Sequence, residues 1–325
     1  MIALSRIRQF AVAALVVCAF AASPAVAQNY PTGPIRIVVG FGPGSTADTL
    51  ARLVGKHIET VLGQPVVVEN RPGNSSMLAA DAVSRADKDG YTLFMATVAQ
   101  TLNPAQTGSA FNLARNMEPI ALLGVVPNVL VAHPSIAANN VKELIEFAKK
   151  NPDGLTFGTS GNGTASHLAT ALFNQKAGTN IMAVHYQGGA AQGVADLLAG
   201  RINLMFNVAA PLAQQVKDGK LKALAVGQPT RTAVMPDVVT MDEAGMPGFD
   251  VGIWIGLLAP AGTPADIVNK LSVAANEALK TEVVKKAMQA QGIDALGSTP
   301  KEFADFIRKD IEKWTSVLSA AGLKK

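Results

Sequence analysis

IRIVVGFGPGSTADTLARLVGKHIETVL, residues 35–62, decides the fold class. The segment begins with a run dense in valine and isoleucine, continues through a glycine-rich turn, and ends with apolar residues at helical spacing. A strand without alternation of polar and apolar residues is typical of a parallel sheet that is buried on both faces. We therefore predict a strand at 35–39, a turn at 40–44 and a helix at 46–62.

The same unit of strand, turn and helix recurs along the chain. Further strands are expected at 65–68, 91–96, 155–158, 182–186, 204–206 and 222–226. Strands that alternate with helices indicate an α/β fold. Amphipathic segments at 265–279 and 300–318 predict helices that pack back onto this fold.

The second half of the chain repeats the scheme of the first, which suits two lobes, and no linker rich in proline, serine or glycine separates the halves. The chain should cross between lobes through ordered segments at 125–133 and 249–258. We assign residues 28–129 and 250–325 to the first lobe and residues 130–249 to the second. Each lobe is predicted to hold a mainly parallel sheet that is flanked by helices.

Residues 1–27 have the pattern of a cleavable signal peptide. Arg6 and Arg8 precede an apolar run at 10–22, and Ala25-Val26-Ala27 forms a small-residue cleavage site. The run is shorter than the ~20 apolar residues that span a bilayer. Export is therefore predicted, with a mature chain that begins near Gln28.

The composition excludes several classes of function. Removal of residues 1–27 lowers the formal charge from +4 to +2, and no basic stripe remains of the kind that nucleic acids require. The single cysteine, Cys18, lies in the same segment, so disulfides and thiol chemistry are not expected in the mature chain. With 49% apolar residues, stability should come from burial.

Glycine-rich turns at 41–46, 158–164 and 186–189 carry the chemical signal. Each turn leads from a strand into a helix, where backbone N–H groups are unpaired and the helix dipole attracts anions. In open α/β sheets, ligands also bind outside the carboxyl ends of the strands. These turns predict a site for a small anion, although any one of them could serve only as a tight connection.

Catalytic, metal and cofactor motifs are not completed. Ser45 breaks the dinucleotide pattern G-x-G-x-x-G, and Asn162 breaks the nucleophile elbow G-x-S-x-G. The histidines do not fall at metal-ligand spacing. We expect no catalytic residue, metal or cofactor, and interpret Ser160 as a hydroxyl contact to a ligand. His185 ends a strand beside the third turn and is also expected to contact a ligand.

Several motifs resemble those of the Bug-type substrate-binding proteins of tripartite tricarboxylate transporters. They include FGPG at 41–44 with Asp48 and Arg52, LGQPVVVENRPG at 62–73, TSGNGTASHL at 159–168 and WIGLLAPAGTP at 254–264. The resemblance covers nearly the whole mature chain. It implies a two-lobed periplasmic binding protein of type II that closes on a small organic carboxylate. Such a receptor, expected to be a monomer, delivers its ligand to membrane permease subunits and is not an enzyme.

The resemblance also implies which residues contact the ligand in the cleft between the lobes. One wall is expected from the first loop and a facing wall from the second, while a third loop and one strand end contact the remainder of the ligand. In that order, the residues are Phe41, Gly44 and Ser45; Thr159, Ser160, Asn162 and Thr164; and His185, Tyr186, Gln187, Gly188 and Asn207.

Departures from the family pattern bear on the identity of the ligand. Ser45 stands where the family usually has a glycine, Gln187 where it usually has a lysine, and Asn207 where relatives often have an aspartate. An aspartate at position 207 could pair with an amino group of a ligand, and Asn207 does so more weakly, so an amino acid is a poorer ligand than an acid whose second group is uncharged or acidic. We therefore expect a carboxylate with a modest second group, such as an aromatic or short-chain acid. The loop at 73–76 also lacks the usual extra glycines.

Two other functions remain open at this stage. A sensory receptor that presents the bound acid to a membrane signalling protein would need the same closed form. A secreted hydrolase could use Ser160 or His185, but neither has an evident acidic partner in the sequence.

Overall fold

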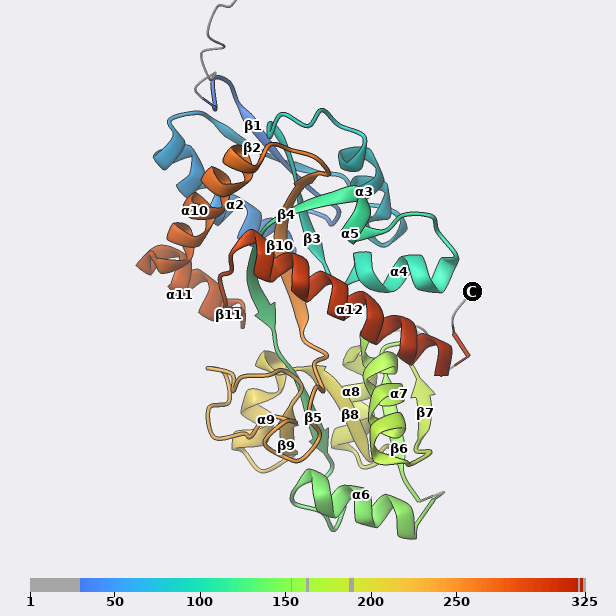
Figure 1. Ribbon diagram of the computed structural model, residues 1–325. Helices are drawn as coiled ribbons and strands as arrows, with labels where there is room; N and C mark the ends of the chain where they lie inside the picture. Colours follow the sequence, from blue (N-terminus) through green and yellow to red (C-terminus); the bar gives the residue numbers. More distant parts are fainter. Residues whose placement is uncertain (1–29, 153, 162–163, 187–189, 321, 324–325) are drawn as a thin grey trace, which may run out of the picture. The chain divides into compact units, whose positions relative to one another are not determined.

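The computed structural model describes residues 30–152, 154–161, 164–186, 190–320 and 322–323. The predicted signal segment lies outside these ranges. Residues 33–325 group as one unit that contains two β-sheets with flanking helices (Figure 1). None of the helices within the described ranges is both long and apolar enough to cross a membrane.

The first sheet has the strand order β11-β4-β10-β3-β1-β2. Its strands are β1 (Ile35–Val39), β2 (Val66–Asn70), β3 (Thr92–Thr97), β4 (Met117–Val126), β10 (Ile253–Pro260) and β11 (Asp294–Ala295). Strands β1, β2 and β3 are parallel, whereas β10 is antiparallel to both β3 and β4. Four strands therefore share one direction, and β10 and β11 run the opposite way.

The second sheet has the strand order β7-β6-β8-β5-β9. Its strands are β5 (Asn128–Ala132), β6 (Thr156–Thr159), β7 (Met182–His185), β8 (Leu204–Val208) and β9 (Lys222–Val226). Only β5 opposes the direction of the other strands of this sheet. The predicted two-sheet α/β class is confirmed, with reversed strands that a purely parallel pattern does not anticipate.

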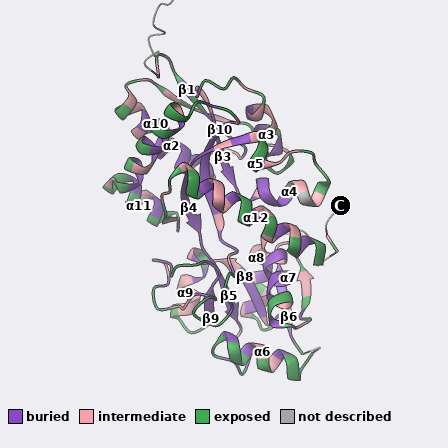
Figure 2. Ribbon diagram, in the orientation of Figure 1, coloured by how far each residue is buried: buried purple, intermediate pink, exposed green. Residues whose placement is uncertain are grey.

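Helices flank both sheets (Figure 1). Their bounds are α2 (Thr46–Leu62), η1 (Asn74–Ser76), α3 (Met77–Ser84), α4 (Ala99–Thr107), α5 (Leu113–Asn116), α6 (Val141–Lys150), α7 (Ala165–Ala177), α8 (Ala190–Leu198), η2 (Ala210–Leu212), α9 (Ala213–Lys217), α10 (Ala265–Lys280), α11 (Glu282–Ala290) and α12 (Pro300–Ala320). Figure 2 shows that the strands are largely buried and that the helices turn exposed faces outward.

Helix α2 illustrates how local sequence produces an element. Ser45 caps its start by accepting the N–H of Asp48, and Gly63 ends it in a left-handed conformation. Leu50, Val54 and Ile58 lie on one face of the helix and are fully buried. The bounds agree with the predicted helix at 46–62.

Two segments connect the sheets. Strand β4 ends at Val126 and β5 begins at Asn128, and the chain returns between the end of β9 and the start of β10. The segments are joined by Asn128, whose Nδ2 donates to the carbonyl of Val251 at 2.7 Å and whose carbonyl accepts the N–H of Gly227 at 2.8 Å. The predicted lobe boundaries near residues 129 and 249 remain predictions, and sheet membership itself changes at Pro127.

The register shows which edges of the two sheets meet these connections. Ile253, which begins β10, pairs with Val126, and Asn128 pairs with Val208 at the end of β8. Strands β6 and β7 run parallel to β8, so their carboxyl ends lie on the same edge. Both sheets therefore present strand carboxyl ends, and the loops that follow them, toward the connecting segments.

Candidate ligand-binding site

A cavity of about 530 Å³ lies at the carboxyl ends of strands from both sheets. Its described lining comes from the first loop, the start of α2, the ends of β3, β4 and β8, the start of β10, η2 and the end of α11. These residues are Phe41, Ser45, Thr46, Ala47, Thr97, Val126, Val208, Ala210, Pro211, Ile253, Ile255, Ala290 and Gln291. None of these lining residues carries a charged side chain.

The cavity adjoins a topological switch point of the first sheet. The chain passes from β1 to β2 on one side and to β3 on the other, because the strand order is β2-β1-β3. Phe41 follows β1 and Thr97 ends β3, and both residues line the cavity. Ligands in open α/β sheets bind at such points.

The start of α2 supplies hydrogen-bond donors to the cavity. Thr46 and Ala47 are the first two helical residues, and the first N–H groups of a helix have no partner within it. Among the described residues, none accepts a hydrogen bond from either amide. Ser45 Oγ accepts the N–H of Asp48 at 3.3 Å, which leaves the hydroxyl hydrogen available to a ligand.

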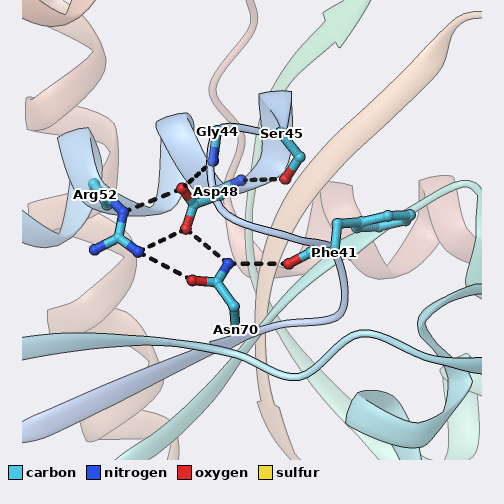
Figure 3. Close-up of polar contacts among 6 residues, drawn as sticks. All are labelled: Phe41, Gly44, Ser45, Asp48, Arg52 and Asn70. Atoms are coloured by element: carbon cyan, nitrogen blue, oxygen red, sulfur yellow. Dashed lines mark hydrogen bonds and ion pairs between the residues drawn. The ribbon is translucent and has the colours of Figure 1, made fainter.

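Asp48 holds the first loop in place (Figure 3). The residue is only 2% exposed, and its Oδ2 accepts the N–H of Gly44 at 2.9 Å. Its Oδ1 accepts Nδ2 of Asn70 at 2.8 Å, and Arg52 donates to both oxygens at 2.9 and 3.1 Å. Asn70 Nδ2 also donates to the carbonyl of Phe41 at 3.0 Å, while the Phe41 ring extends away from these polar groups.

The carboxylate of Asp48 does not bond back to the N–H of its cap, Ser45. Its Oδ2 accepts the N–H one residue earlier, at Gly44. The Gly44 amide is therefore bonded within the protein here, and its contact with a ligand stays a prediction. The free donors of this turn are one helical step further on, at Thr46 and Ala47.

Electrostatics in the first loop favour an ionised Asp48. Burial by itself would raise the pKa of this carboxyl group, but hydrogen bonds from Arg52, Gly44 and Asn70 outweigh it and hold the pKa below its usual range. The charge of Arg52 acts in the same direction. Because Asp48 and Arg52 neutralise each other, the nearby helix N-terminus remains attractive to an anion.

The second loop is bonded within itself. Thr159 is fully buried, and its Oγ1 lies 2.7 Å from Nδ1 of His185. Ser166 Oγ accepts the backbone N–H of Ser160 at 2.9 Å and lies 2.9 Å from Ser160 Oγ. Thr164 caps α7, as its position at the helix start predicts. None of these described residues is part of the cavity lining.

The third loop and the end of β8 differ in their relation to the cavity. The Tyr186 hydroxyl donates to Asp196 at 2.9 Å, and burial together with this bond raises the pKa of the phenol. The rings of His185 and His167 pack edge to face, with 4.5 Å between their centroids. Burial lowers the pKa of His167, and the charge of His185 lowers it further. Asn207 accepts the N–H of Val208, and it is Val208 that lines the cavity.

The structure thus brings only some of the predicted contacts together. Phe41 and Ser45 line the cavity, whereas Thr159, Ser160, Thr164, His185 and Tyr186 surround neighbouring strand ends without lining it. The predicted contacts Asn162, Gln187 and Gly188 lie outside the described residues. Across the ranges that are described, histidine, cysteine and acidic side chains form no group that could hold a metal ion.

Sequence reasoning missed Thr46, Ala47, Thr97 and Pro211. The first two follow directly from the cap at Ser45, which places their unpaired amides at the start of the helix. Thr97 ends a strand beside the switch point, but that position depends on strand order. Pro211 carried no sequence signal, because it reaches the cavity only through the arrangement of the two sheets.

Two α/β sheets connected by paired segments, with a ligand-sized cavity at their strand ends, define a periplasmic solute-binding protein. Residues 50–323 match the family described as the tripartite tricarboxylate transporter family receptor, and the chain belongs to this family. The family and the solved structures similar to this chain are solute-binding receptors.

Relatives of known name or structure support this assignment. BugT from Bordetella pertussis is 33% identical over 309 residues, which cover 93% of this chain and 94% of BugT. MatC from Rhodopseudomonas palustris, solved with bound malate, is 30% identical with a TM-score of 0.65 and covers 89% of this chain and 100% of its own. A second R. palustris protein, solved with adipate, is 30% identical with a TM-score of 0.68. The match covers 90% of this chain and 98% of that protein.

Proposed function

We propose that this receptor binds a small organic carboxylate in the cavity at the start of α2 and delivers it to the permease subunits of a tripartite tricarboxylate-type transporter. The chain is exported to the periplasm by the signal segment 1–27 and acts there as a monomer. Residues 28–129 with 250–325 form one lobe and residues 130–249 the other. The ligand is held between them.

The observation that carries this proposal is the pair of amides at Thr46 and Ala47. Both residues line the cavity, and their N–H groups have no acceptor among the described residues. A helix N-terminus bears roughly half a positive charge, so it can bind a carboxylate without lysine or arginine. Malate and adipate in two similar receptors are ligands of this chemical class.

Closure of the receptor follows from contacts on both sheets. Phe41 and Ser45 belong to the first sheet's loops, whereas Val208 ends a strand of the second sheet and Pro211 follows that strand. A ligand stabilises a closed form only through the additional contacts that it makes there. In this proposal, Thr159, Ser160 and Thr164 approach the ligand on closure, together with His185, Gln187 and Gly188. The Tyr186 hydroxyl group keeps its bond to Asp196.

A proline at position 46 tests the amide directly. Proline lacks the N–H but is favoured at the first position of a helix, and the extended Ser45 (ψ 158°) tolerates a following proline. Thr46→Ala, which removes the side chain and keeps the amide, is the matched control. Isothermal titration against a carboxylate panel should show binding to Thr46→Pro that is weaker by about tenfold or more, because a hydrogen bond to a charged group is lost.

The same substitution in the second loop separates two locations for the carboxylate. Ala165 is the first residue of α7, and its cap Thr164 is also extended (ψ 165°). We expect Ala165→Pro to weaken binding less than Thr46→Pro does. Strong loss in Ala165→Pro with unchanged affinity in Thr46→Pro would move the carboxylate to the second loop and refute the assignment to α2.

A further inference from the structure

We infer that the natural ligand of this receptor is a monocarboxylate with an apolar body and not a dicarboxylate. The inference rests on the proposed function and specifies the chemistry of the same cavity. It sets this chain apart from the two similar receptors that were solved with malate and adipate, which both carry two carboxylate groups.

The described lining of the cavity provides for one negative charge. Asp48 and Arg52 form an ion pair with N–O distances of 2.9 and 3.1 Å, so Arg52 is already committed to an acid of the protein. What remains is the N-terminus of α2, whose donors Thr46 and Ala47 suit a single carboxylate.

A second carboxylate would find no cation in the described lining. The polar side chains outside the first loop and the start of α2 are Thr97 and Gln291, and both are uncharged. A buried carboxylate without a counter-charge is strongly unfavourable, because its lost hydration is not replaced. A second acid group on the ligand should therefore weaken binding.

The rest of the cavity is suited to hydrocarbon. Strand ends and η2 contribute apolar side chains, and the Phe41 ring points away from the polar network behind it. The apolar residues are Val126, Val208, Ala210, Pro211, Ile253 and Ile255. Each methylene group buried against such a surface strengthens binding by about fourfold.

Two matched pairs of acids test this inference by isothermal titration. Hexanoate and adipate share six carbons and differ in the second carboxylate, and 4-methylbenzoate and terephthalate differ in the same way. We expect the monocarboxylate of at least one pair to bind about tenfold more tightly than its dicarboxylate, and butyrate to bind more weakly than hexanoate. Hexanol, which lacks the charge, should not compete.

The possible failures are distinguishable. Tighter binding of the dicarboxylate in both pairs overturns the inference and leaves the proposed carboxylate receptor intact. Absence of binding by all four acids at millimolar concentration also rejects the inference. A broader thermal-shift panel of carboxylates then decides the proposed function separately, since a ligand of the folded state raises its melting temperature.

An introduced cation gives an independent readout. Ala290 is exposed, lines the cavity and ends α11, where a positive side chain is compatible with the helix dipole. Ala290→Arg should raise the affinity for adipate relative to hexanoate by about threefold or more, whereas Ala290→Gln, the uncharged control, should not. An equal ratio in the two variants would show that the lack of a cation is not what disfavours a second carboxylate, and it would contradict the inference.

Discussion

The carboxylate of Asp48 accepts the backbone N–H of Gly44 at 2.9 Å, so an acid of the protein occupies a donor in the very loop that was expected to bind the ligand's acid. The bond joins the turn after β1 to the first turn of α2. It fixes the orientation of the next amides, at Thr46 and Ala47, before any ligand arrives. Preorganised donors of this kind reduce the ordering cost of binding.

Replacement of Asp48 by asparagine should therefore affect both stability and affinity. The amide cannot accept all of the bonds from Gly44, Arg52 and Asn70, and Arg52 loses its counter-charge. We expect a loss of about 2–3 kcal/mol in the free energy of unfolding, measured in urea. Asp81→Asn is the control, because Asp81 pairs with Arg85 on the surface and should cost less than about 1 kcal/mol. Similar losses in both variants would contradict the role given to Asp48.

The pH dependence of the free energy of unfolding should also reveal the ionised, paired state of Asp48. The pKa of Asp48 is lower in the folded chain than the value of about 3.9 for a free aspartate. Its contribution is thus fully present above pH ~4 and is lost as the pH falls through the folded pKa. Urea denaturation between pH 5 and pH 3 should show a shallower decline for Asp48→Asn than for the unaltered protein. Parallel curves would argue against an ionised, paired Asp48.

The turn before α3 should become more stable when glycine is restored. Asn74, Ser75 and Ser76 have φ values of 47°, 50° and 70°, a left-handed conformation that non-glycine residues rarely adopt. We expect Ser75→Gly to raise the free energy of unfolding by about 0.5 kcal/mol, as the relieved strain exceeds the added entropy of the unfolded chain. Ser316→Gly, within helix α12, should instead lower it. Destabilisation by both changes would refute the assignment of strain to this turn.

Close packing beside the first loop leads to a further prediction. A Cβ added at Gly40 would lie 1.7 Å from Ser76 Oγ and 2.8 Å from its Cα. Gly40→Ala should lower the free energy of unfolding by about 1–3 kcal/mol, the usual cost of overpacking, and should weaken ligand binding through displacement of Phe41. Addition of Ser76→Gly should recover part of both losses. Additive effects in this double-mutant cycle would show that the two positions do not interact.

Substitution of Tyr186 tests whether its hydroxyl group contacts the ligand or makes only a structural hydrogen bond. Its hydroxyl group already donates to Asp196, so Tyr186→Phe should cost about 1 kcal/mol of stability. We expect the affinity for the ligand to remain within about twofold, measured by titration calorimetry. A tenfold loss of affinity would instead show that this hydroxyl group reaches the ligand when the receptor closes.

The features that depend on local sequence were predictable. Ser45, the apolar spacing and Gly63 together specify the ends of α2, and β9 likewise agrees with the predicted strand at 222–226. Strand β4 was not predicted, and β5 and β10 were expected only as ordered crossing segments at 125–133 and 249–258. Short apolar strands look the same in either direction, so the reversal of β5 and β10 could not be recognised from the sequence. Direction is decided by the connections between the sheets.

The candidate site was predictable to the extent that it consists of turns after strands. Phe41 and Ser45 belong to the cavity because they follow β1, and the family resemblance indicated the same loop. The use of the Gly44 amide depends on the rotamer of Asp48 and on Asn70, which comes from another strand. Such cooperation among three segments leaves no pattern in a single stretch of sequence.

The side chain and carbonyl of Asn128 tie the two connecting segments to each other. Bending at one segment is consequently transmitted to its neighbour, and independent swivelling would first have to break these bonds. In the proposed receptor, opening and closing would therefore involve both segments together. A substitution at position 128 is expected to change the rate of ligand release, although Asn128 does not line the cavity.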